Sequence, residues 1–280
     1  MRLEPAVLDL DWNEVERRAR LFIKKYVEQT SSSGVVLGLS GGVDSSTSAA
    51  LAALALGGDK VTGLLLPERE TYSNIDVQHA KHISERFQIR TETIDITSAL
   101  DAFYRSTPSF DGRDKVTKGN IKARMRMIYV YYYANKYGLL VCGNSDKSET
   151  MMGYFTKWGD VSADFAPLMD LYKTQVRKLA RHLGLPEQIV KKPSSPGLWP
   201  SQSAEQELGV DYETLDLILC GLEHFMDSEE IASQIQADIE LVQRVMFRWL
   251  TSEHKRRMPL TTKIQYRTPG MDFRLARVTA

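Results

Sequence analysis

The sequence predicts an α/β fold in which a parallel sheet carries helices on both faces and is followed by a helical C-terminal part. Three observations predict it. Short apolar runs alternate with segments of helical composition and spacing as far as residue 144. Each run is short enough to be a strand buried on both faces, as in parallel sheets. After about residue 211 the pattern is helical and no further strand is expected.

The elements follow in order along the chain. Residues 11–30 have apolar residues at three-and-four spacing, which predicts an amphipathic helix. Strands are expected at 34–40, 61–67, 91–96 and 139–144. Helices are expected at 45–56, where Gly57 and Gly58 end the helix, at 75–87, in segments up to 137, at 147–156, at 172–183, and from 212 to about 257.

Length and composition limit the class of protein. The 280 residues are predicted to form one domain over 1–280, with 258–280 as an atypical tail. Lys+Arg and Asp+Glu are both 36, so nucleic-acid and membrane partners are not expected and any anion must be held locally. Cys142 and Cys220 form no metal or disulfide pattern, and neither a signal peptide nor a membrane span is evident. These features predict a cytoplasmic protein.

Two segments suggest assembly and motion. Residues 127–134, "MIYVYYYA", are apolar or aromatic on every side of the expected helix. We expect one face to meet the sheet and the other to meet a second copy, giving a homodimer. Residues 191–209 contain three prolines and two glycines without periodicity. Because Leu198 and Trp199 lie in this stretch, we interpret it as a lid rather than as disorder.

The stretch "LSGGVDSS" between the first strand and its helix has the composition of a phosphate cradle. Gly41 and Gly42 would let an anion approach the backbone N–H groups at a helix N-terminus. Ser40, Ser45 and Ser46 add hydroxyl donors. No lysine follows the glycines, so the loop differs from that of the P-loop nucleoside triphosphatases.

Asp44 is unusual in such a cradle because its carboxylate would repel a phosphate. A cation between the two groups removes the conflict, and Mg²⁺ is commonly shared by carboxylates and phosphates. The alternative is that Asp44 only caps the helix. The surrounding glycines and serines favour the magnesium interpretation.

The loop resembles the pyrophosphate-binding loop of the N-type ATP pyrophosphatases. With "KGNIKARMRM" (118–127), the stretch at 143–186 and "SEHKRRMP" (252–259), the chain resembles the ammonia-dependent NAD synthetases over most of its length. The resemblance implies an adenine nucleotide alpha-hydrolase-like fold, Rossmann-like with three layers. It implies that deamido-NAD is adenylated by ATP, with release of pyrophosphate. Ammonia then displaces AMP to give NAD.

The resemblance also implies roles for particular residues. For the metal it implies Asp44 and Glu149, and for catalysis Asp44, Lys173 and, as an acid attracting ammonium, Asp160. The implied ATP-binding residues are Gly38, Leu39, Ser40, Gly41, Gly42, Val43, Asp44, Ser45, Asn144, Lys173 and Ser194. For deamido-NAD they are Arg124, Lys157, Asp164, His254 and Lys255.

From the residues alone, simpler interpretations stay open. Glu149 could merely favour a helix dipole, and Lys173 could be an exposed lysine in a first helical turn. Ser194 could be an ordinary loop serine, and "HKRR" (254–257) a solvated basic helix end.

The sequence departs from the family pattern at two places. Asn144 stands where threonine is usual, and Val161-Ser162 replaces a glycine pair. The tail from 258 differs from the usual ending and has no functional interpretation.

The rival functions are a sulfur-inserting or RNA-modifying enzyme of the same superfamily, and a nucleotide-binding regulator without catalysis. Thiolation would favour a reactive cysteine pair, and RNA a basic excess. Ammonia is expected as the nitrogen source, because a glutaminase needs its own domain and cysteine nucleophile.

Overall fold

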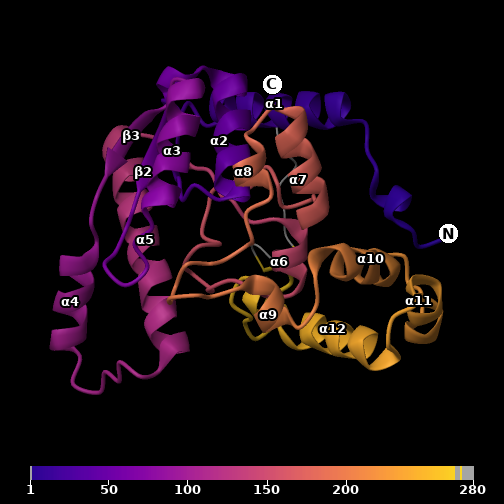
Figure 1. The fold of residues 1–280 in the computed structure, drawn as a ribbon. Helices are drawn as coiled ribbons and strands as arrows, with labels where there is room; N and C mark the ends of the chain where they lie inside the picture. Colours follow the sequence, from indigo (N-terminus) through magenta and orange to yellow (C-terminus); the bar gives the residue numbers. More distant parts are fainter. Residues whose placement is uncertain (1, 269–271, 273–280) are drawn as a thin grey trace.

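A computed structural model describes residues 2–268 and 272. At its centre lies a four-stranded, all-parallel sheet in the order β3-β2-β1-β4 (Figure 1). The strands are β1 (Val35–Gly38), β2 (Val61–Leu65), β3 (Arg90–Thr93) and β4 (Leu140–Val141). All four predicted strands are present and each is shorter than expected. Residue 142 extends β4 only by an isolated bridge to Phe165.

Helices cover both faces of the sheet, which confirms the predicted three-layer class. Val35 and Leu37 of β1 enter one buried cluster and Val36 enters another, as alternation along a strand requires. The first face carries α1 (Trp12–Gln29), α2 (Val43–Leu56), α3 (Asn74–Arg86), α7 (Lys173–His182) and α8 (Glu187–Val190). The second carries α4 (Thr97–Ser106) and α5 (Lys115–Tyr137).

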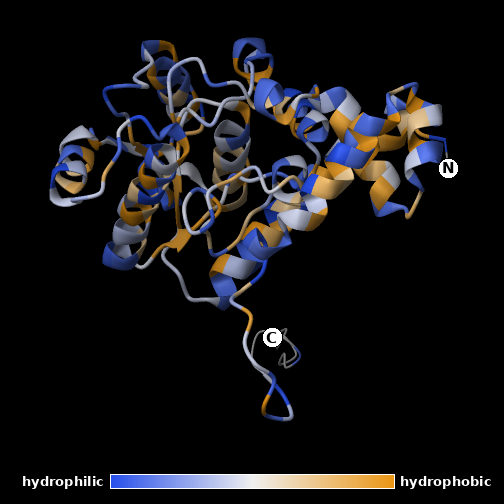
Figure 2. Ribbon diagram, turned by 90° about the horizontal axis from the view of Figure 1, so that it is seen from below, coloured by the Kyte–Doolittle hydropathy of each residue, from blue (hydrophilic) through white to orange (hydrophobic). Residues whose placement is uncertain are grey.

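The C-terminal helices form a cluster of their own beside the sheet, and Figure 2 shows both hydrophobic and hydrophilic residues along them. They are α9 (Ala204–Leu208), α10 (Tyr212–Glu223), α11 (Ser228–Ile235) and α12 (Ile239–Thr251). Short 3-10 turns lie at Pro5–Leu8, Gly58–Lys60 and Glu253–Lys255. The helical run expected from 212 to 257 is broken where Phe225 and Gln236 adopt positive φ. Asp227 and Asp238 then cap the next helices.

Two predicted boundaries were wrong. The helix expected at 147–156 is α6 (Lys147–Met151). It cannot continue because Gly153 has φ +59°, and a Cβ there would lie 2.4 Å from the Cβ of Ser252. The stretch 191–209, expected to be irregular throughout, contains α9 near its end.

The aromatic run on α5 is not buried all round in the single chain. Val130 and Ala134 pack in the sheet-facing cluster, as predicted. Ile128 and Tyr132, four residues apart, are 54% and 56% exposed. No residue within 2–268 covers these two side chains, and the homodimer stays a prediction. Within the described residues, no helix combines the length and hydropathy that a membrane crossing needs.

Candidate active site

The loop between β1 and α2 leads directly into the first turn of α2. Gly42 is the N-cap and makes no side-chain cap hydrogen bond to that turn, whose N–H groups have no partner earlier in the helix. Gly41 has φ +76°, and an added Cβ would lie 2.2 Å from the carbonyl oxygen of Asp76. Only glycine fits there. Ser40 and Ser45 join their hydroxyls at 3.0 Å across the loop. The loop therefore offers an anion site at the positive end of a helix.

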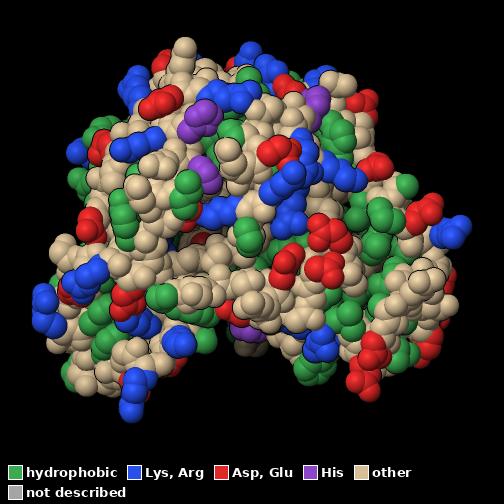
Figure 3. Space-filling model, in the orientation of Figure 1, with side chains coloured by type: hydrophobic (Ala, Val, Ile, Leu, Met, Phe, Trp, Pro, Cys, Tyr) green, Lys and Arg blue, Asp and Glu red, His purple; other side chains and the backbone are tan. Residues whose placement is uncertain are grey.

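A cavity of about 520 Å³ opens beside this loop, at the carboxyl ends of the strands. It is lined by residues of the 38–45 loop, the segment after β2, α5, the stretch 141–162 and the segment 192–202. Figure 3 shows the surface hollowed near its centre, between the part that carries α5 and the part that carries α9. A cavity of this size suits a nucleotide or another small molecule.

Beside the loop, Lys173 is fully buried among three carboxylates. Its Nζ lies 2.8 Å from Asp44 Oδ2, 2.7 Å from Asp146 Oδ2 and 2.9 Å from Glu149 Oε1. The sequence offered an exposed first-turn lysine as the alternative for Lys173, and that alternative is wrong. So is the capping role for Asp44, because the N-cap of α2 is Gly42.

The pKa values of Lys173 and its neighbouring carboxylates depend on one another. Burial raises the pKa of Asp146, and it raises the pKa of Glu149 well above its usual value. Burial alone would lower the pKa of Lys173, but the three carboxylates raise it well above that of a free lysine. The lysine thus stays charged and is the counter-ion for the acids.

Local hydrogen bonds fix these side chains. Asp146 caps α6 and accepts from the backbone N–H of Glu149 at 2.8 Å. Lys173 begins α7, and its N–H donates to Ser148 Oγ. Buried Asp216 accepts from that hydroxyl and from the N–H of Thr174, and burial raises its pKa to about 7. Asp216 thereby joins α10 to the first turns of α6 and α7.

The acid cluster fits a hard divalent cation. Asp44, Asp146 and Glu149 each offer an oxygen, and these atoms lie within 4.8 Å of one another. In the part of the chain that the structure describes, Asp44 Oδ1 has no hydrogen-bond partner. An oxygen so placed is available to a metal ion.

Other residues implied for ATP also line the cavity. Asn144 donates from Nδ2 to the carbonyl of Gly38 at 2.9 Å, and its Oδ1 has no hydrogen-bond partner among the described residues. The same is true of the hydroxyl of Ser194. Both side chains therefore have an oxygen free for a ligand.

The residues implied for the dinucleotide are divided. Lys255 lines the cavity, and burial lowers its pKa; Asp160, the residue implied for ammonium, lines the cavity as well. Arg124, Lys157 and His254 lie outside its lining but touch one another: Arg124 donates to the carbonyl of Lys157, whose Nζ donates to that of His254 at 2.6 Å.

Asp164 is separate from both groups. It accepts from the N–H of Val141 at 2.7 Å and does not line the cavity. The structure thus brings together the residues implied for phosphate and metal, and of those implied for the dinucleotide it places only Lys255 in the lining of the cavity.

Sequence reasoning missed Asp146 and Asp216. Asp146 stands three residues before Glu149, and the spacing D-x-x-E at a helix start could have marked it as an N-cap beside the metal ligand. Asp216 carries no local signal, because only the packing of α10 brings it to the site.

The fold and site define an α/β enzyme in which a glycine-serine loop at a helix N-terminus lies beside a cavity and a cluster of three carboxylates. The profile of the NAD synthase family matches residues 15–259, and the chain belongs to that family. It is a ligase that forms carbon–nitrogen bonds.

Individual relatives agree with this assignment. The chain is 47% identical over 254 residues to an NH(3)-dependent NAD(+) synthetase of Hyperthermus butylicus, covering 90% of this chain and 91% of that protein. Among solved structures, it matches an NMN synthetase from Francisella tularensis with TM-score 0.81 and 36% identity, covering 91% and 100% of the two chains. An NH3-dependent NAD synthetase from Campylobacter jejuni matches with TM-score 0.77 and 31% identity, at the same coverage.

Proposed function

We propose that the chain amidates deamido-NAD to NAD, using ATP and ammonia, through an acyl-adenylate. The observation that carries the proposal is the buried Lys173 between three carboxylates at the edge of the phosphate loop. A cation cluster beside an anion cradle suits a nucleotide triphosphate held together with a metal.

The reaction balances in two steps. The nicotinate carboxylate attacks the α-phosphorus of ATP, so that a carbon–oxygen–phosphorus link forms and pyrophosphate leaves. Ammonia then attacks the acyl carbon, AMP leaves with the bonding electrons of its oxygen, and one proton is released. The tasks of the protein are to align two large anions and to stabilise charge on phosphoryl oxygens.

The roles follow from position. The N–H groups at Gly41–Ser45 would hold the pyrophosphate portion, and Lys173 would turn from the acids to the phosphates. Asp44 and Glu149, with Asp146, would hold Mg²⁺, which would neutralise phosphate charge when bound. Asn144 and Ser194 would contact ATP.

Asp160 is proposed to attract ammonium and to help remove its proton. It lines the cavity and accepts from the N–H of Thr156 at 2.8 Å, which fixes its position there. An unchanged ammonia dependence of the rate in Asp160→Asn would remove this role.

Arg124, Lys157, Asp164, His254 and Lys255 are proposed to bind deamido-NAD. Arg124 is exposed on α5, on the same helix as the open Ile128 and Tyr132. A homodimer formed over that face would bring a second chain beside Arg124. We therefore propose that the dinucleotide site lies near the dimer interface.

The direct experiment supplies the protein with Mg²⁺, ATP, deamido-NAD and ammonium and measures products. We expect NAD and AMP in equal amount, with pyrophosphate. ADP and phosphate in place of AMP and pyrophosphate would contradict adenylation. Product formed from glutamine but not from ammonium would contradict the nitrogen source.

The likeness to an NMN synthetase favours a second acceptor for the same assay. The acid form of that mononucleotide carries the same nicotinate carboxylate, and the adenylation chemistry would be the same. A kcat/KM for the mononucleotide above that for deamido-NAD would replace the proposed substrate.

The cysteines speak against sulfur insertion. Burial raises the pKa of Cys142 to about 12, and burial also raises that of Cys220. Neither thiol is activated as a nucleophile.

A further inference from the structure

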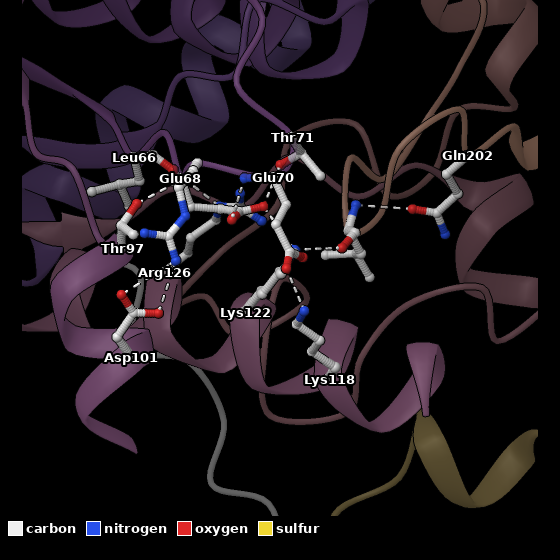
Figure 4. A network of polar contacts seen from close by, with 12 residues as sticks. Leu66, Glu68, Glu70, Thr71, Thr97, Asp101, Lys118, Lys122, Arg126 and Gln202 are labelled. Carbon is white, nitrogen blue, oxygen red and sulfur yellow. Dashed lines mark hydrogen bonds and ion pairs between the residues drawn. The ribbon is translucent and has the colours of Figure 1, made fainter. Parts of the chain in front are cut away.

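Both backbone polar groups of Leu198, in the segment 191–209, are hydrogen-bonded to side chains: one within the segment and one on α5 (Figure 4). The N–H of Leu198 donates to Oε1 of buried Gln202 at 2.9 Å, and its carbonyl accepts from Lys122 Nζ at 2.9 Å. Leu198, Trp199 and Gln202 all line the cavity beside the phosphate loop, whereas Lys122 does not. The position of this segment therefore depends on a lysine outside the cavity.

Lys122 lies on α5 and is 1% exposed. Its Nζ has three acceptors from three parts of the chain: Glu68 Oε1 at 2.7 Å, Glu70 Oε2 at 2.9 Å and the carbonyl of Leu198. An ammonium has three N–H donors, so all of them are used. If Leu198 moved away, one donor of a buried cation would lose its partner, which is costly.

The other end of this contact is rigid. Glu68 follows β2, is 4% exposed, and accepts from Thr71 Oγ1 and from the N–H of Glu70. Burial alone would raise the pKa of Glu68, but the hydrogen bonds from Lys122 and its neighbours lower it. Because Glu68 is fixed by its own loop after β2 and Lys122 lies on a long helix, we take the segment 191–209 as the part that adapts.

Packing supports the same contact. Gly119 lies one turn before Lys122 on α5, and a Cβ there would lie 3.0 Å from Leu198 Cβ and 3.1 Å from the Trp199 ring. The segment thus packs directly on the surface of α5 at Gly119, where glycine has no side chain to keep it away.

We infer that Lys122 is a positioning residue that holds the 191–209 segment against the cavity and so strengthens nucleotide binding. The inference rests on the proposed function in taking ATP as the ligand. Since Lys122 touches neither the cavity nor the acid cluster, its loss should weaken binding and leave the chemical step nearly unchanged.

The test compares Lys122→Met with Lys118→Met. Lys118 is a matched control because it pairs with the same Glu70 and, among the described residues, has no hydrogen bond or ion pair to the segment. Hydrogen exchange of the amides in 197–202 should be about tenfold faster in Lys122→Met, and KM for ATP should rise about tenfold with kcat within about threefold. Lys118→Met should stay within about twofold of the wild type in each measurement.

Equal exchange and equal KM in Lys122→Met and the wild type would overturn the inference, as would equal effects in the two variants. Should Lys122→Met fail to fold, Glu68→Gln/Lys122→Met removes both buried charges together. Gly119→Ala displaces the segment without changing any charge and favours the helix. It should raise KM for ATP without lowering Tm. Hydrogen exchange needs no acceptor, so a wild type that makes no NAD would contradict the proposed function and leave this inference testable.

Discussion

Lys173 shows how a single residue can serve two states of a site. Its ammonium lies within 2.9 Å of three carboxylates, and it neutralises part of their charge. A metal ion would take over that task and free the lysine for phosphate oxygens. The lysine and a divalent cation are thus alternative counter-ions for one cluster.

The first prediction follows from this exchange. In Lys173→Met the acids lose their counter-ion, so the unfolding free energy without metal should fall by about 3 kcal/mol or more. Millimolar Mg²⁺ should raise the Tm of this variant by more than it raises that of the wild type. The variant should also lose catalysis. Lys147→Met, which removes a lysine paired with Glu223, is the control. An equal response to Mg²⁺ in all three proteins would count against the cation cluster.

Asp216 gives a prediction on pH. Its pKa is raised from 3.8 to about 7 because it is buried, so the folded state holds its proton more tightly than the unfolded chain. Its stabilising contribution is complete below about pH 4 and is lost as the pH rises to 7. Relative to Asp216→Asn, the unfolding free energy of the wild type should therefore fall by up to about 1.4 kcal/mol per pH unit across that range. Urea unfolding at several pH values would show it, and a difference that does not vary with pH would refute it.

At the scale of elements, the site depends on the junction between β1 and α2. The strand ends at Gly38, α2 begins at Val43, and the four residues between them make the cradle. The backbone of Asp76 on α3 closes over Gly41 and fixes the turn.

Gly41→Ala should therefore lower the unfolding free energy by about 2–3 kcal/mol, because the position combines positive φ with a 2.2 Å contact. Gly42→Ala is the matched control. Its φ is −84° and an added Cβ would meet only Ser40 Oγ at 3.4 Å, so its cost should stay within about 1 kcal/mol. Chemical denaturation of both variants measures these unfolding free energies. An equal loss of unfolding free energy in the two variants would disprove the stated role of Gly41.

How much the sequence could predict varies with the element. The four strands, their parallel arrangement and the glycine-serine loop before α2 follow from local pattern, and all were predicted, whereas the strand order was not. Boundaries such as the end of α6 were not predicted. Gly153 there has positive φ and packs closely against Ser252, about a hundred residues away in the sequence. Asp216 and Lys122 were missed for the same reason: their partners are distant in sequence, and only packing brings them together.

At the scale of the whole molecule, the open face of α5 is the feature that the single chain leaves unexplained. Ile128 and Tyr132 are more than half exposed on a helix whose opposite side packs on the sheet. An apolar face of this kind fits a symmetric contact with a second copy.

We predict a dimer by sedimentation at micromolar concentration, and a shift toward monomer in Tyr132→Glu, which would place charge in the contact. Phe247→Glu is the control, since Phe247 is 67% exposed on α12, away from this face. A monomeric wild type, or a Tyr132→Glu dimer as stable as the wild type, would contradict the predicted interface. If Tyr132→Glu loses both dimerisation and deamido-NAD binding, that result would support a substrate site near the interface.

We propose above that the site activates a nicotinate carboxylate by joining it to the α-phosphorus of ATP. The most direct measurement uses deamido-NAD labelled with ¹⁸O in that carboxylate, followed by mass analysis of the released nucleotide. With both carboxylate oxygens labelled, one labelled oxygen should appear in each AMP. The oxygen that bridges the acyl carbon and the phosphorus stays on the phosphorus when ammonia attacks the carbon. Label in inorganic phosphate, or AMP without label, would contradict the account.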